Sequence, residues 1–112
     1  MGKNKVFLAN RSLYGLRVLY EYEGESGLFY LDAGPSQKLK NHSPNGFNWG
    51  YHGSGPSQLA LALLLDVVGR AKALKHYQEF KRWHVACFSD DEWAMSAKDI
   101  KFFVEERERR HD

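Results

Sequence analysis

Cysteine is almost absent from this sequence. Cys87 is the only one among 112 residues, so no disulfide can form within the chain, as is typical of proteins from reducing compartments. The first residues lack the apolar segment of a secretory signal, and the longest apolar run, residues 59–65, is too short to cross a bilayer. These features predict a cytoplasmic protein without a membrane partner.

An excess of charge of one sign is also missing. The sequence has 16 Lys and Arg residues and 14 Asp and Glu residues, which gives a formal net charge of +2. A nucleic-acid-binding domain usually shows a concentrated basic footprint, so we expect no nucleic-acid partner. The residues that could bind zinc do not have recognisable spacing, so we expect no metal and no cofactor; they are His42, His52, His76, His84 and Cys87.

Motifs for covalent catalysis are missing as well. Cys87 falls in the apolar run 84–88, which we interpret as a short β-like segment, and there it is expected to be buried and structural. Ser54 is flanked by glycines, but the Gly-x-Ser-x-Gly pattern of a nucleophile elbow is absent. We therefore predict no catalytic residues and a non-enzymatic protein.

The strand patterns lie in the first third of the chain. Residues 17–23 alternate between apolar and charged side chains, and residues 28–31 follow a turn-forming segment as the hairpin partner. Residues 5–8 indicate a further strand. Because strands precede helices, we predict one α+β domain over residues 1–112, with a small antiparallel sheet packed against a buried central helix and two further helices.

The central helix is predicted to begin near Pro56, with Ser54 or Gly55 as its N-cap, and to end at Gly69 in the left-handed αL conformation. Residues 59–65 are apolar on every side, so this helix should be the most buried one. A second helix is expected over residues 71–83, and its inward side chains are predicted to be Leu74, Tyr77, Phe80 and Trp83. Its basic side chains are expected to be solvated, and these are Arg70, Lys72, Lys75, His76, Lys81 and Arg82.

A Ser-x-x-Asp capping pattern at residues 96–99 predicts the start of the last helix. Ile100, Phe103 and Val104 form its apolar stripe, and residues 105–112 are expected to be frayed.

A long loop over residues 33–55 leads into the central helix and contains the main candidate site. A helix N-terminus favours anions, and glycines let the backbone approach a ligand closely. Hydroxyl groups could donate to an anion, aromatic rings could stack on a base, and a strand-borne guanidinium could clamp the same anion. The predicted ligand-binding residues are Trp49, Tyr51, Gly53, Ser54, Gly55, Ser57 and Arg17. The alternative is structural: the glycines only allow tight turns, and the aromatic rings fill the core.

Residues 49–64 resemble the pattern W-G-Y-x-G-S-G-P-x-Q-L-A-L-A-L-L of an uncharacterised family of small bacterial and phage proteins. Tyr14-Gly15-Leu16-Arg17 is similar to a shortened form of an element that precedes this pattern in the family. The resemblance implies a shared fold and a shared site, but no activity.

Two hypotheses about function follow. The first is a binding protein that holds an anionic or nucleotide-like small ligand at residues 49–58. The second is a protein-interaction module, such as a phage or mobile-element inhibitor of a host defence protein, in which exposed aromatic and charged side chains make the contact. The oligomeric state is left open by the sequence.

Overall fold

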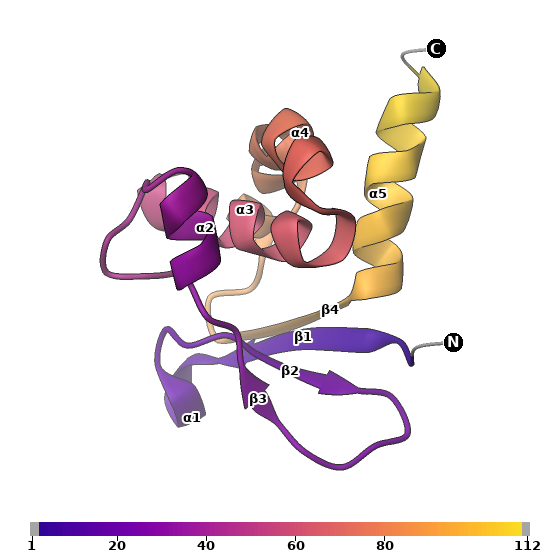
Figure 1. Ribbon diagram of the computed structural model, residues 1–112. Helices are drawn as coiled ribbons and strands as arrows, with labels where there is room; N and C mark the ends of the chain where they lie inside the picture. Colours follow the sequence, from indigo (N-terminus) through magenta and orange to yellow (C-terminus); the bar gives the residue numbers. More distant parts are fainter. Residues whose placement is uncertain (1–2, 111–112) are drawn as a thin grey trace.

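The computed structural model describes residues 3–110 (Figure 1). Four strands form one antiparallel sheet in the order β3-β2-β1-β4. Helices α2, α3, α4 and α5 lie on one side of this sheet, and α1 lies apart from them at one end (Figure 1). The elements are β1 (Lys5–Asn10), α1 (Arg11–Tyr14), β2 (Leu19–Tyr22), β3 (Phe29–Tyr30), α2 (Gly34–Leu39), α3 (Ser54–Val68), α4 (Arg70–Trp83), the 3-10 helix η1 (Val85–Cys87), β4 (Glu92–Ser96) and α5 (Ala97–Arg110). The predicted α+β class is confirmed.

The sheet has one core face and one outer face. Phe7 in β1 is fully buried in the hydrophobic core, and it pairs with Tyr20 on β2 and Met95 on β4. Because neighbouring side chains along a strand point to opposite faces, Leu8 lies on the outer face. Leu8 pairs with Leu19 and Ala94, and Leu19 pairs in turn with Tyr30 of β3. An apolar row therefore crosses the face that α2–α5 do not cover.

The helix α3 is the most buried helix, as the sequence predicts. Its ten residues 55–64 are all buried. Gln58 is the one long polar side chain among them, and each end of its amide finds partners. Its Oε1 accepts from the backbone N–H groups of His42 (2.7 Å) and Ser43 (2.9 Å), and its Nε2 donates to Ser36 Oγ (3.0 Å) and the Lys40 carbonyl (3.2 Å). Gln58 therefore ties the segment between α2 and α3 to the core.

Two predicted boundaries of α3 differ in detail. Its N-cap is Gly53, rather than Ser54 or Gly55, because the Gly53 carbonyl already accepts from the Ser57 N–H at 3.1 Å. Gly69 ends the helix as predicted and has a positive φ of 85°, but its ψ of 175° lies outside the αL region.

Two predicted segments adopt other structures. The loop 33–55 contains the helix α2, which begins beside Pro35 and whose Gly34 N–H donates to Asp32 Oδ1 at 2.9 Å. Residues 84–88 do not form a strand; they contain η1, and the strand of this region is β4. β4 was not predicted, because it is short and only Trp93 and Met95 face the core.

The observed burial corrects the predictions for several side chains. Leu74 and Trp83 of α4 are exposed, whereas Tyr77 and Phe80 are buried as predicted. His76, expected on the solvated face, is buried and lies 3.3 Å from Glu108 Oε2. Cys87 is exposed, because η1 turns it away from the core.

The last helix begins as predicted, with the Asp99 N–H donating to Ser96 Oγ at 3.0 Å. Ile100, Phe103 and Val104 are buried, also as predicted. Residues 105–110 are helical, so the prediction of fraying is wrong for them, and residues 111–112 lie outside the described part of the chain.

Candidate functional site

The glycine loop before α3 is held by the protein's own side chains. Trp49 is 1% exposed, meets Trp93 edge-on at a centroid distance of 5.9 Å, and donates from Nε1 to the Asp90 carbonyl at 3.1 Å. The guanidinium of Arg11 lies 5.0 Å from the centroid of the Trp49 ring. Arg11 also donates to Asn48 Oδ1 (3.3 Å) and to Asp90 Oδ1 (3.0 Å). Trp49 is thus enclosed by groups of the same chain.

The space beside each of the two glycines that were predicted to face a ligand is filled by other residues of this chain. A Cβ at Gly55 would lie 2.6 Å from Asn48 Cβ and 3.2 Å from Asn48 N. A Cβ at Gly53 would lie 2.6 Å from the Tyr51 ring, and Gly53 has an extended φ of 178° that any residue adopts. The close approach that glycine allows in this loop is therefore made by Asn48 and Tyr51.

The remaining residues of the predicted loop site differ in accessibility. Ser57 is buried, whereas Tyr51 and Ser54 are exposed. Among residues 3–110, no side chain caps the N-terminus of α3. Tyr51 and Ser54 are therefore the accessible side chains of the predicted set in this loop.

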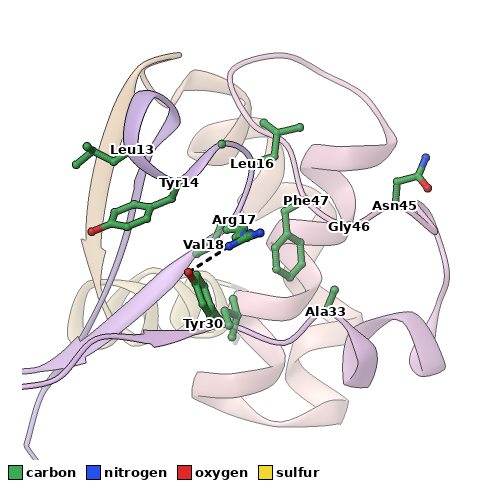
Figure 2. A pocket seen from close by; sticks show the side chains of 12 residues that line it. Leu13, Tyr14, Leu16, Arg17, Val18, Tyr30, Ala33, Asn45, Gly46 and Phe47 are labelled. Atoms are coloured by element: carbon green, nitrogen blue, oxygen red, sulfur yellow. Dashed lines mark hydrogen bonds between the residues drawn. The ribbon is translucent and has the colours of Figure 1, made fainter.

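Arg17 lies elsewhere, in an open cleft of about 910 Å³ (Figure 2). We call this the Arg17 cleft; it is lined by residues 13–18, 30–31, 33 and 45–47. Arg17 Nη1 donates to the Tyr30 hydroxyl at 3.2 Å, and the guanidinium carbon lies 5.2 Å from the Tyr30 ring centroid. None of the other predicted site residues lines this cleft.

The lining of the Arg17 cleft combines apolar groups with one charge. Val18 and Phe47 are buried side chains at its base, while Leu16 and Tyr30 are exposed. Figure 2 shows Arg17, Tyr30 and Phe47 around the same space. Arg17 is the only Lys, Arg, Asp or Glu residue in the lining. The cleft is therefore suited to an anionic group attached to an apolar body.

One wall of the cleft is the short helix α1. Asn10 caps it, because its Oδ1 accepts from the Leu13 N–H at 3.0 Å, and Gly15 ends it with a positive φ of 64°. No residue of α1 is buried, and Leu13 is 71% exposed. Leu13 and Tyr14 also line a second hollow of about 360 Å³, together with Leu8 and Ala94 of the outer sheet face. The helix α1 is thus a ridge between two hollows.

The opposite wall belongs to the segment that Gln58 holds. His42 Nε2 and the Tyr77 hydroxyl are 2.7 Å apart, which joins this segment to α4. Burial lowers the pKa of His42 below its ordinary value, and the positive charges of Lys40 and Lys81 lower it further. The neutral form of His42 therefore predominates at pH 7. The wall that carries Phe47 is tied to the core at two points, through Gln58 and through His42.

Sequence reasoning missed Arg11, Asn48 and Asp90, which surround Trp49, and Tyr30, which holds Arg17. The N-cap residue Asn10 was the available signal for α1. Arg17 lies two residues before β2, not in the strand as predicted, and it reaches Tyr30 of the neighbouring β3. The predicted hairpin was the available signal for this contact.

The described residues offer little for metal binding or for crossing a membrane. Residues 3–110 contain no cluster of three or more His, Cys, Asp or Glu side chains arranged to hold a metal ion. Within the same range, no helix is both long and apolar enough to span a bilayer.

The fold and the cleft define a small α+β protein with an exposed apolar ridge beside a singly charged hollow. The chain belongs to a family of unknown function, DUF6166, which it matches over residues 7–106. The prediction of membership in an uncharacterised family is confirmed to this extent. No curated protein and no solved structure matches the chain.

Proposed function

We propose that this protein is a non-enzymatic binding module whose partner is another protein, docked on α1 and in the Arg17 cleft. The observation that carries the proposal is the ridge itself. A helix with no buried residue and a leucine at 71% exposure lies between two hollows. Contiguous exposed apolar surface of this kind marks interaction sites on proteins.

A protein partner fits this surface better than a small ligand does. Small-molecule pockets usually enclose most of the ligand's surface. Here Leu13, Leu16 and Tyr30 are exposed at the rim, and the neighbouring hollow continues over Leu8 and Ala94 of the sheet. A ridge with hollows on both sides suits a partner large enough to contact all three.

The charge of the cleft specifies the chemistry of the partner. Arg17 has no carboxylate among the residues that line the cleft with it. Its contact with Tyr30 uses Nη1 and holds the planar group in place. A guanidinium fixed in this way can donate two parallel hydrogen bonds to a carboxylate. We therefore propose that the partner presents an acidic side chain next to apolar ones.

The resemblance to small bacterial and phage proteins extends the proposal to the partner's role. In that case the partner is a cytoplasmic host protein, such as a defence protein, and the module inhibits it by covering its surface.

A random peptide display library tests the proposal with a defined probe. Selection on the wild-type protein should enrich peptides that combine Asp or Glu with large apolar residues. Selection on Arg17→Glu should replace the acidic residues by basic ones, and Leu13→Ser should weaken binding of the wild-type peptides by about tenfold. Lys75→Glu, an exposed substitution on α4, is the matched charge control and should leave the selection unchanged. Enrichment that ignores both Arg17 and Leu13 would refute the proposal.

The predicted ligand at residues 49–58 is a second candidate, favoured by the uncapped N-terminus of α3. The exposed Ser54 begins this helix, and no side chain within the described range 3–110 accepts a hydrogen bond from its first N–H groups. We propose that phosphate, sulfate or a nucleotide, including a cyclic dinucleotide, would bind there beside Tyr51. Calorimetry with these anions should give binding to the wild type but not to Ser54→Asp, whose carboxylate would occupy the helix N-terminus. Binding weaker than millimolar would remove this candidate.

A further inference from the structure

The helices α4 and α5 lie far from α1 (Figure 1), and they carry a second exposed apolar surface. It borders a hollow of about 510 Å³. Trp83 at the end of α4 is 59% exposed, and Phe102 on α5 is 61% exposed. We call this the Trp83–Phe102 face; it shares no lining residue with the Arg17 cleft.

Trp83 is held in position although it is exposed. The guanidinium carbon of Arg107 lies 5.9 Å from the Trp83 ring centroid and 4.8 Å from that of Phe103. Arg107 is itself fixed by an ion pair with Glu79. An aromatic side chain that is ordered before binding loses less entropy when it is covered, and Trp and Arg are enriched where interfaces bind most strongly.

The charges of this face are arranged in order along α5. The residues of α5 that line the hollow are Asp99, Phe102, Phe103, Glu106, Arg107 and Arg110. Their spacing places them on one side of the helix, and in this subsection we call these six residues the stripe. Glu106 is paired with Arg109, at 2.9 Å. Within residues 3–110, Asp99 and Arg110 make no ion pair through their side chains. One end of the stripe therefore offers a carboxylate and the other end a guanidinium.

The order of charges along this stripe is complementary to that of a second copy of α5 running in the opposite direction. An antiparallel copy of α5, related by a two-fold axis between residues 104 and 105, places Asp99 opposite Arg110 of the second copy. The same arrangement places Phe102 opposite Arg107 of the second copy. Because a two-fold interface repeats each contact, two ion pairs and two guanidinium–aromatic contacts form at once.

We propose that two copies of this chain form a symmetric dimer through the Trp83–Phe102 face, with their α5 helices antiparallel. Charge complementarity selects a second copy as the occupant. A face that recognises a different, charged partner is expected to carry one dominant sign, whereas this one carries both signs in a self-matching order. The proposal is independent of the partner proposed for the Arg17 cleft.

Sedimentation equilibrium over a concentration series tests the dimer, with Asp99→Lys and Arg110→Glu as the principal variants. The wild type should show a reversible monomer–dimer equilibrium. Each variant alone should weaken the dimer by about tenfold or more, because both ion pairs become repulsive. An equimolar mixture of the two variants should recover wild-type affinity, since in the mixed dimer the introduced lysine faces the introduced glutamate and the native Arg110 faces the native Asp99.

Two further variants complete the experiment. Phe102→Asp should weaken the dimer by about a hundredfold, because it places a charge among apolar contacts. Lys101→Glu is the matched control for Arg110→Glu, since it makes the same charge change at an exposed position of α5 outside the stripe. Circular dichroism and the melting temperature verify that each variant is folded. A wild type that remains monomeric at its solubility limit would overturn the proposal, and so would a dimer that these variants leave unchanged or that the mixture fails to restore.

Discussion

The glycine loop and the Arg17 cleft contain similar side chains in different environments. Each has an arginine near an aromatic ring: Arg11 lies against Trp49 in the loop, and Arg17 lies against Tyr30 in the cleft. Arg11 also bonds to Asn48 and Asp90, and Trp49 is buried. Within residues 3–110 the side chain of Arg17 bonds only to the Tyr30 hydroxyl, and Tyr30 is 57% exposed.

From this difference we propose a structural role for the glycine loop and a binding role for the Arg17 cleft. The groups of the glycine loop satisfy one another, so changes there should reduce the free energy of unfolding. The groups of the cleft have few partners within the described chain, so changes there should alter binding with little effect on stability. The buried residues of this conspicuous motif, Trp49, Gly55 and Ser57, are thus packed within the protein.

The largest expected effect is that of Trp49→Ala. Removing this buried indole opens a cavity beside Trp93 and loses the hydrogen bond to the Asp90 carbonyl, so the free energy of unfolding should fall by about 3–5 kcal/mol. Chemical denaturation measures this change. Tyr51→Ala is the matched control, because Tyr51 is an exposed aromatic of the same loop, and it should cost less than about 1 kcal/mol. Equal losses in both variants would contradict the assigned roles.

The next effect distinguishes the two glycines. In Gly55→Ala the new methyl group meets the Asn48 Cβ and backbone N, which cannot move without disturbing Trp49, so we expect a loss of about 1–3 kcal/mol. In Gly53→Ala it meets only the Tyr51 ring, an exposed side chain that can rotate away, and φ is already extended. The cost should therefore stay below about 1 kcal/mol. Thermal unfolding of the pair measures the difference, and the reverse order would refute the packing assigned to Asn48.

The sequence predicts the elements that local patterns specify. The alternation of β2, the apolar run of α3 and the capping serine of α5 each determine structure over a few neighbouring residues. The strand β4 was missed, because Trp93 is placed by Trp49 and Phe88, and a local pattern does not reveal such contacts. The helix α2 was missed because Gly34 and Pro35 are common in turns, although Asp32 here bonds to the Gly34 N–H.

The candidate site was predictable only in part. Arg17 was identified as a possible anion clamp, but its neighbour Tyr30 depends on the pairing of β2 with β3. The apolar ridge of α1 was not identified, since exposure of Leu13 depends on how the whole chain folds around the sheet. Sequence alone also did not show that Asn48 and Tyr51 approach the loop glycines.

A smaller effect is the difference in stability between substitutions of the two arginines. Arg11→Gln removes hydrogen bonds to Asn48 and Asp90 and the contact with the Trp49 ring, so it should cost about 1 kcal/mol. Arg17→Gln should change stability by less than about 0.5 kcal/mol, because Arg17 is exposed and its side chain makes a single hydrogen bond. Urea denaturation of both variants measures the difference. A larger loss for Arg17 would show that the cleft is part of the structural framework.

The smallest expected effect is a pH dependence of the melting temperature. It arises at His42, where the wall of the cleft is joined to the core. The pKa of His42 is lowered in the folded protein by burial and by Lys40 and Lys81. The unfolded chain therefore takes up a proton first as the pH falls. The stabilising contribution is complete above the ordinary pKa of about 6.5 and is lost as the pH falls through the lower folded value. The melting temperature of the wild type should thus decrease between about pH 7.5 and about pH 5.5.

Two variants test whether this decrease in melting temperature arises at the wall of the Arg17 cleft. His42→Gln removes the titrating group and can still bond to the Tyr77 hydroxyl, so its melting temperature should depend less on pH. The pKa of His84 is also lowered, by burial and by Arg107 against the opposing charge of Asp99, and His84→Gln measures that separate contribution. Hydrogen exchange at Ser43, whose N–H donates to Gln58, should accelerate at the lower pH in the wild type relative to His42→Gln, after correction for intrinsic exchange rates. If exchange there has the same pH dependence in both proteins, protonation of His42 does not loosen the wall, and the two attachments of this segment act independently.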